Sequence, residues 1–97
     1  MRILSKSTLR EFWLLHLDAE APLRDWFKET LAADWANPNE VKQHYGSASI
    51  VANNRVVFNI KGNSYRLVVE IGYAARIVFI LFIGTHQDYD KINVATI

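Results

Sequence analysis

Residues 58–71 read FNIKGNSYRLVVEI, and this stretch predicts a β-hairpin. Gly62 and Asn63 stand between two alternating runs, and both residue types tolerate the positive φ that a two-residue hairpin turn requires. A turn centred on this pair fixes the register of the two strands. The predicted opposite pairs are Lys61 with Ser64, Asn59 with Arg66, Val57 with Val68, and Arg55 with Glu70.

The two faces of this hairpin differ in chemistry. One face is predicted to be core, because it carries only apolar and aromatic side chains: Val56, Phe58, Ile60, Tyr65, Leu67 and Val69. The other face gathers polar and basic side chains near the tip: Asn59, Lys61, Ser64 and Arg66. Further from the tip, Arg55 and Glu70 are predicted to form an ion pair. The hairpin thus predicts a sheet with one face in the core and one basic face suited to binding RNA.

The chain has 97 residues, no cysteine and a net charge of +1. This length predicts one domain, residues 1–97, with a single core. The lack of cysteine removes disulfides, thiolate metal sites and thiol nucleophiles. The charge balance is too weak for a protein that holds nucleic acid by charge alone. The basic excess nevertheless lies in the second half, where five Lys and Arg face three Asp and Glu from Gly46 onward.

No segment predicts a membrane span or a signal peptide. The longest apolar run, Ile77–Ile83, has seven residues, whereas a transmembrane helix needs roughly 20. The segment Met1–Leu4 leads into Ser5 and Lys6 without the apolar stretch of a signal peptide. We therefore expect a cytoplasmic protein that does not act at a membrane.

The first half of the chain predicts two amphipathic helices, roughly Thr8–Leu17 and Glu20–Ala33. Residues Thr8–Glu11 have the pattern of a capping box, Asp18 is placed to cap the second helix, and Pro22 falls in its first turn. The apolar faces of the two helices consist of Leu9, Phe12, Trp13 and Leu17, and of Leu23, Trp26, Phe27, Thr30 and Leu31.

The second half predicts one more helix and then a sheet. Residues Asn37–Glu40 supply an N-cap, a first-turn proline and an acid three residues on. The apolar part of Arg76–Gly84 does not alternate, which predicts a central strand covered on both faces. Gly72–Ala75 would join it to the hairpin as an antiparallel meander, and Thr85 would cap a short C-terminal helix. With Arg2–Leu4 as a further strand, the fold class is α+β.

Several of these segments together resemble the HigB toxins of bacterial type II toxin-antitoxin systems. The resemblance rests on residues 53–63 (NNRVVFNIKGN), 65–67 (YRL), 83–86 (IGTH) and 89–90 (YD). The front half agrees at LREFW (9–13), DAE (18–20), PL (22–23), ADW (33–35) and YGSA (45–48). The matching motifs extend over nearly the whole chain.

This resemblance implies both a fold and a function. The fold would be RelE-like, with two N-terminal helices packed on a small antiparallel sheet and a short C-terminal helix. The activity would be that of an mRNA endoribonuclease that acts on the ribosome and inhibits translation and growth, without a cofactor. The partner would be an antitoxin of the HigA type, whose helix-turn-helix part would give the toxin only an indirect connection to DNA.

The residues can be assigned chemical roles in such a reaction. Metal-independent RNA cleavage uses the ribose 2′-hydroxyl as nucleophile and needs a proton acceptor, a proton donor and cations for the phosphorane charge. Arg66 suits the phosphate because its planar fork binds bidentately, and Lys61 adds a second positive charge. His86 is the expected general acid or base, Tyr89 could share that work, and Asp90 could orient His86. The residues expected to contact RNA are Asn59, Lys61, Asn63, Ser64 and Arg66.

Each of these residues also has a structural interpretation. Basic side chains on a solvent-facing hairpin are common, and His86 is equally consistent with a helix start. Asp90 belongs to a type favoured in the first turn of a helix. The three tryptophans fit the core or an antitoxin contact better than base stacking. No metal-ligand motif is present, so a metal enzyme is not expected.

A second function class therefore stands beside the nuclease: a non-catalytic RNA- or protein-binding module that uses the same basic face. The discriminating feature is the pair of His86 and Tyr89. A binding module needs the cations of the hairpin but has no use for a titrating group beside them.

Overall fold

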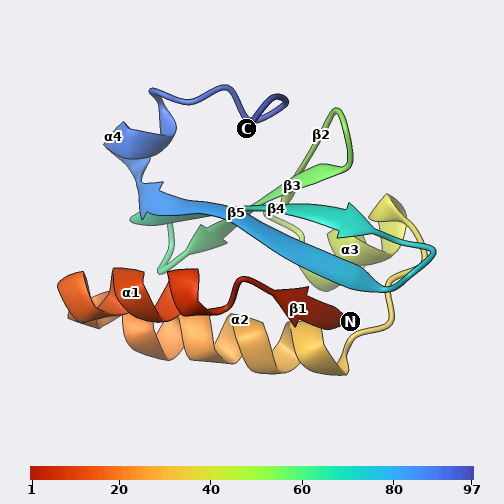
Figure 1. The fold of residues 1–97 in the computed structure, drawn as a ribbon, viewed down its shortest axis with the longest axis horizontal. Helices are drawn as coiled ribbons and strands as arrows, with labels where there is room; N and C mark the ends of the chain where they lie inside the picture. The colour runs from red at the N-terminus through yellow and green to blue at the C-terminus, as the bar shows by residue number, and fades with distance from the viewer.

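The predicted hairpin forms part of a five-stranded sheet with the order β1-β5-β4-β3-β2 (Figure 1). A computed structural model describes residues 1–97. Its strands are β1 (Arg2–Leu4), β2 (Ser49–Val51), β3 (Arg55–Ile60), β4 (Tyr65–Gly72) and β5 (Ile77–Thr85). Strands β1 and β5 run parallel, and the other three neighbouring pairs run antiparallel.

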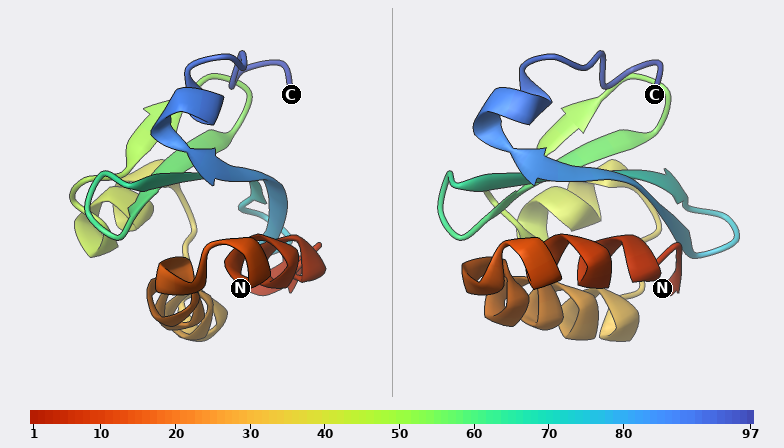
Figure 2. Two further views of the ribbon diagram at one scale, coloured as in Figure 1. Left: turned by 90° about the vertical axis from the view of Figure 1, so that its left-hand side faces the viewer. Right: turned by 60° about the vertical axis from the view of Figure 1, so that its left-hand side comes forward.

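The helices lie on both sides of this sheet. They are α1 (Ser7–Leu15), the 3₁₀ turn η1 (Leu17–Ala19), α2 (Glu20–Ala32), α3 (Pro38–His44) and α4 (His86–Tyr89). Figures 1 and 2 show α1 and α2 side by side on one face of the sheet, with α4 and the end of the chain on the other. The α+β class is confirmed. No helix has the length and apolar character of a membrane span.

The register of the hairpin is confirmed, but its turn is not the predicted one. The pairs Arg55 with Glu70, Val57 with Val68 and Asn59 with Arg66 form as expected. The ladder ends at Ile60 and Tyr65, so the loop comprises the four residues 61–64. Positive φ occurs at Lys61 (52°) and Gly62 (62°), and the expectation for Asn63 is wrong. The register is unaffected because the longer loop is still centred between Gly62 and Asn63.

The apolar face of the hairpin is the centre of the core, as predicted. All six of its predicted residues are buried in one cluster with side chains from the helical layer. Within it, Phe58 meets Trp26 at 5.4 Å and Tyr45 at 5.1 Å between ring centroids, both edge to face, which is a favoured aromatic geometry. The buried helical residues of the cluster are Leu9, Ala19, Leu23, Trp26 and Val41.

The opposite face of the hairpin is covered over its middle part and open at its tip. Further along, Val57 and Val68 are 3% and 0% exposed. The end of the chain lies over this region: Asn53 Nδ2 donates to the Ala95 carbonyl at 2.9 Å. Arg55 forms the predicted ion pair with Glu70, at 3.5 Å between Nη1 and Oε2. The accessible polar surface therefore consists of the loop, the residues next to it and, further along, the Glu70 side chain, which is 43% exposed.

Strand β5 differs from its prediction in position and in phase. It is an interior strand, but β4 is the middle strand of the five, and Phe79 is 39% exposed. Val69 pairs with Ile80 whereas Val68 pairs with Phe82, so Leu81 is an extra residue, a β-bulge. Because side chains alternate along a strand, one extra residue moves every following side chain to the other face.

Several local predictions of the first half were wrong. Helix α1 begins at Ser7, and no side chain caps it, so the capping box at Thr8 does not form. Leu17 and Leu31, both assigned to apolar stripes, are 74% and 54% exposed. Asp18 forms no cap for α2. The reason is that η1 carries the chain directly into α2, and the Asp18 carboxylate is engaged elsewhere.

Other local predictions hold. The Asn37 side chain accepts the Glu40 N–H at 3.0 Å and caps α3, and Arg2–Leu4 is a strand, paired with β5. Strand β2 was not predicted, because its three residues show no usable pattern and two of them are exposed.

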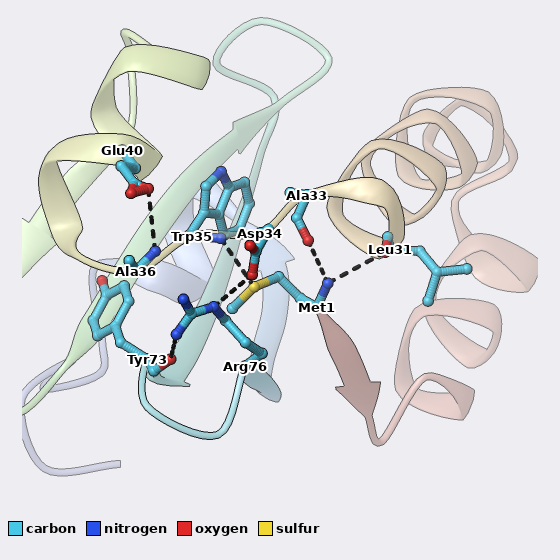
Figure 3. Close-up of polar contacts among 9 residues, drawn as sticks. All are labelled: Met1, Leu31, Ala33, Asp34, Trp35, Ala36, Glu40, Tyr73 and Arg76. Atoms are coloured by element: carbon cyan, nitrogen blue, oxygen red, sulfur yellow. Dashed lines mark hydrogen bonds and ion pairs between the residues drawn. The ribbon is translucent and has the colours of Figure 1, made fainter.

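The link between α2 and α3 is fixed to the end of the sheet far from the hairpin tip (Figure 3). The Met1 nitrogen donates to the Ala33 carbonyl at 2.5 Å, and the Trp35 N–H points to the Met1 sulfur at 3.3 Å. Arg76, which has a positive φ of 58°, reaches Asp34 at 2.5 Å through Nε. These contacts join β1, the α2–α3 link and the β4–β5 loop.

Candidate functional site

The sheet register brings the end of β5 next to Arg66. Arg66 pairs with Gly84, and the preceding Tyr65 pairs with Thr85, the last residue of β5. Helix α4 starts at the next residue. The Thr85 hydroxyl accepts the Asp88 N–H at 3.2 Å, so the predicted N-cap is confirmed. Because the cap fixes where the helix begins, α4 lies over the end of the sheet that carries Arg66.

Gly84 allows α4 to approach this closely. A Cβ atom at position 84 would lie 2.5 Å from Cζ of Phe82 and 3.2 Å from Cβ of Asp88. The bulge at Leu81 explains the crowding, since it places Phe82 and Gly84 on the same face as Val68 and Arg66. A glycine is therefore favoured here by close approach, and its φ is not in the left-handed region.

Arg66 is held between the hairpin loop and α4. Its Nη1 donates to the Asn63 carbonyl at 3.1 Å, and its guanidinium carbon lies 5.9 Å from the centre of the Tyr89 ring. That separation is within the range of a cation–π contact. The residue is half-buried, so the plane of its fork is constrained while the group keeps access to solvent.

His86 and Asp90 form a second pair on α4 and the residue that follows it. His86 Nδ1 lies 3.2 Å from Asp90 Oδ2, and their side chains are 53% and 60% exposed. The pair has the i, i+4 spacing that places two side chains on one helical face. A hydrogen bond from Nδ1–H would leave Nε2 as the free nitrogen of the imidazole.

Lys61 lies apart from this group. It was expected on the same face as Arg66, and this placement is wrong. Its Nζ lies 2.5 Å from Oδ2 of Asp18, whose other oxygen accepts the hydroxyl of Tyr65, a residue of the core face. The cause is the left-handed backbone at Lys61 (φ 52°), which ends the alternation of the strand and turns the side chain toward the helical layer.

The Asp18 carboxylate is thus the centre of a three-residue cluster. Its hydrogen bond to Lys61, followed by that to Tyr65, lowers the pKa of Asp18 below 3.8. The hydrogen bond between the Tyr65 hydroxyl and Asp18 raises the pKa of Tyr65 above 10.0. Both directions follow because these hydrogen bonds and the nearby ammonium favour the ionised carboxylate.

The remaining residues expected to contact RNA lie around the hairpin tip. Asn59 is half-buried and opposite Arg66, whereas Asn63 and Ser64 are exposed in the loop. The Ser64 N–H donates to the Lys61 carbonyl at 3.1 Å. Of the predicted residues, the structure brings together Arg66 with Tyr89 and His86 with Asp90, and it places Lys61 with Asp18.

Sequence reasoning missed Asp18 and Gly84. Asp18 was interpreted as a helix cap, and no local pattern connects it to a hairpin more than forty residues later. Gly84 had a usable signal, because a glycine that ends an apolar strand can mark close approach of another segment.

This end of the molecule can bind and protonate an anion. It offers a guanidinium, an imidazole and a phenol on an open surface, which are the group types needed for charge stabilisation and proton transfer at a phosphate. No three His, Asp or Glu side chains gather in a way that could hold a metal ion.

The fold is that of a small α+β domain, a five-stranded sheet with helices on both of its faces. The family model of the HigB toxins, described as a RelE-like toxic component of a toxin-antitoxin system, matches residues 19–92. The chain belongs to this family, and is therefore the toxin of a toxin-antitoxin pair with an antitoxin as its partner. No curated protein matches the chain.

Proposed function

We propose that this toxin is a ribosome-dependent mRNA endoribonuclease. In the reaction, the ribose 2′-hydroxyl loses its proton and attacks the adjacent phosphorus, and the 5′-oxygen leaves with a proton. The products are a 2′,3′-cyclic phosphate and a 5′-hydroxyl. The observation that carries the proposal is the position of Arg66 beside α4. Its guanidinium carbon lies 5.9 Å from the centre of the Tyr89 ring, and His86 is the first residue of the same helix.

In this proposal Arg66 binds the scissile phosphate. Its planar fork can donate two parallel hydrogen bonds to phosphate oxygens and keeps its charge throughout. The Asn63 carbonyl and the Tyr89 ring hold the guanidinium, so little reorganisation is needed as negative charge develops.

His86 transfers a proton in the same reaction, as general base or general acid. Asp90 orients its imidazole through the 3.2 Å contact at Nδ1, leaving Nε2 to exchange the proton with RNA. Tyr89, three residues along α4, donates a hydrogen bond to the phosphate or shares the proton transfer. Both groups are on α4, so one short helix would supply the proton chemistry.

Lys61 and the polar residues of the tip would hold the RNA strand. Lys61 adds positive charge when phosphate competes with Asp18 for its ammonium group. The amides and hydroxyl of Asn59, Asn63 and Ser64 are suited to phosphate and ribose oxygens. Affinity for nucleic acid depends mainly on phosphate neutralisation, and a net charge of +1 supplies little of it. Because the affinity for free RNA should be low, we favour mRNA held by the ribosome as the substrate.

The proposed partner is an antitoxin of the HigA type, with a helix-turn-helix part that binds DNA. The toxin would reach DNA only through it, and would act in the cytoplasm because its substrate is translated there. The arrangement of α1 and α2 against one face of the sheet is consistent with the RelE-like fold that this function implies.

The experiment compares wild-type toxin with His86→Ala. Induction of the wild type should arrest growth, and primer extension on cellular mRNA should show new 5′ ends in translated regions. His86→Ala should remain folded and bind ribosomes, but should produce no new 5′ ends. Growth arrest by both proteins without mRNA cleavage would instead support the non-catalytic binding module.

A further inference from the structure

A groove of about 390 Å³ lies between α1 and α2. None of the proposed catalytic residues Arg66, His86 and Tyr89 lines it. Its apolar lining consists of Leu9, Trp13 and Phe27. Leu9 is buried, whereas Trp13 and Phe27 are half-buried and keep part of their rings accessible. Two helices that pack through a core normally leave charged side chains on their outer surface, so accessible aromatic area at this seam is a feature to explain.

The rim of the groove is basic. Lys6, Arg10 and Arg24 line it, and no acidic residue does. Arg24 lies over the Trp13 ring at 4.7 Å and donates to Glu20 at 2.8 Å. Lys6 and Arg10 take part in none of the six ion pairs of the molecule. Two unpaired cations beside an apolar floor form a surface that complements a partner with carboxylates around an apolar side chain.

The apolar surface continues past the groove along α1. Leu14 follows Arg10 by four residues and so lies on the same side of the helix, and it is 61% exposed. An exposed leucine alone needs no explanation. Here Leu14 extends the groove by one helical turn. A partner helix makes contact through anchor residues on successive turns, so a longer apolar surface suits such a partner.

The groove belongs to a different side of the molecule from the proposed catalytic group. Helices α1 and α2 lie on one face of the sheet and α4 on the other (Figure 1). One face of the Trp13 ring is already covered by Arg24, so a base could stack on the other face only. These observations favour a protein partner over RNA as the occupant.

We propose that this groove is a docking site for the antitoxin, through an acidic segment that inserts an apolar side chain between Trp13 and Phe27. The proposal rests on the membership in a toxin family and not on the nuclease chemistry. A partner bound here would leave Arg66, His86 and Tyr89 uncovered. Neutralisation would then need a second antitoxin contact that covers these residues, or an antitoxin large enough to keep the toxin from entering the ribosome.

The test uses the antitoxin encoded next to the toxin gene, as a purified protein, and measures its affinity for toxin variants by calorimetry. Arg10→Glu reverses an unpaired rim charge. Lys28→Glu makes the same change at an exposed residue of α2 that does not line the groove, and is the matched control. We expect at least a tenfold loss of affinity for Arg10→Glu, growing as salt is lowered, and less than a twofold change for Lys28→Glu. The same variants are co-expressed with the antitoxin, where Arg10→Glu should stay toxic and escape neutralisation.

A second variant tests the apolar part of the site. Trp13→Ala should weaken antitoxin binding at high salt as well, because the lost contact is not ionic. Since Trp13 is half-buried, its circular dichroism and melting temperature are compared with the wild type, while Arg10→Glu, at an exposed position, carries the test if Trp13→Ala unfolds.

Two results would overturn the docking proposal. Equal antitoxin affinity for Arg10→Glu and Lys28→Glu would show that the groove is not the contact. Reduced ribosome association of Arg10→Glu with unchanged antitoxin affinity would show an RNA or ribosome surface instead. A failure of the nuclease proposal would be visible separately, as absence of mRNA cleavage by a wild type that still binds antitoxin.

Discussion

Lys61 Nζ lies 2.5 Å from Asp18 Oδ2, and this contact ties the tip of the β3–β4 hairpin to the turn that precedes α2. The same carboxylate accepts the Tyr65 hydroxyl, so one acidic group holds the first residue of the loop and the residue that follows the loop. Arg66, between them and α4, has no carboxylate partner among the ion pairs. The two cations expected to act together thus have separate environments: one is neutralised by Asp18 and the other is free to meet an anion.

Asp18→Asn should release the hairpin tip in a pH-dependent way. The pKa of Asp18 is lowered from 3.8 by Lys61 and Tyr65, so the folded state favours the ionised form. The stabilisation is therefore present above 3.8 and is lost as pH falls through the lowered value. Wild type should melt higher than Asp18→Asn near neutral pH, and the difference should disappear in strong acid.

The control for this prediction is Asp25→Asn, an exposed acid of α2 without a hydrogen-bond or ion-pair partner. Its melting temperature should follow that of the wild type across the pH range, apart from a constant offset. A difference between wild type and Asp18→Asn that does not depend on pH would contradict a role for the ionised carboxylate.

Arg66→Lys should separate charge from geometry at the proposed site. Lysine keeps the positive charge but loses the bidentate fork and the position of the guanidinium over the Tyr89 ring. The loss of one preorganised donor to a developing oxyanion costs about 3 kcal/mol, or roughly a 100-fold lower rate. Cleavage of ribosome-bound mRNA should fall by about that factor while ribosome binding stays within a few-fold of wild type. Arg2→Lys, at an exposed position of β1, serves as the control.

Leu67→Ala should destabilise the protein through its core. Leu67 is 0% exposed and lies in the cluster shared by the sheet and the helices. A leucine truncated at such a position costs about 2–5 kcal/mol, because transfer energy is lost and a cavity remains. Urea denaturation measures this as a lower midpoint. Leu15→Ala, at a position that is 83% exposed, should change the free energy of unfolding by less than about 0.5 kcal/mol.

Periodic patterns in the sequence predicted the features that local physics decides. The alternation around Gly62 gave the register of β3 and β4, and the helix caps at Asn37 and Thr85 formed where their residue types indicated. In these cases the residues that determine the structure are neighbours along the chain or directly opposite across one turn.

The features that sequence reasoning missed depend on contacts between distant segments. A run of apolar residues such as Ile77–Ile83 has no phase, so nothing in it reveals the bulge at Leu81 that decides which side chains join Arg66. The direction of Lys61 depends on a left-handed residue in a loop and on Asp18 in another element. Both errors affect the candidate site more than the fold, because the site lies at the ends of strands, where alternation stops.

The close packing at Gly84 gives the sharpest test of how α4 contributes to the proposed activity. In Gly84→Ala the new methyl group would meet the Phe82 ring at 2.5 Å and Asp88 Cβ at 3.2 Å. The end of the half-buried Phe82 side chain can rotate away, but the contact with Asp88 Cβ is on α4 itself, so α4 should shift outward and carry His86 and Tyr89 away from Arg66. We expect cleavage to fall at least tenfold, a cost of about 1.4 kcal/mol.

Gly46→Ala is the matched control for this change. No atom lies within 4 Å of a Cβ at position 46, and Gly46 is not among the residues with positive φ, so activity and stability should match the wild type. The variants are compared by cleavage of ribosome-bound mRNA and by the protection of α4 amides in hydrogen exchange. Faster exchange in α4 together with lower cleavage in Gly84→Ala would support the proposed role of this helix. Full cleavage despite a displaced α4 would mean that neither His86 nor Tyr89 acts on the RNA, because only Arg66 would remain in place.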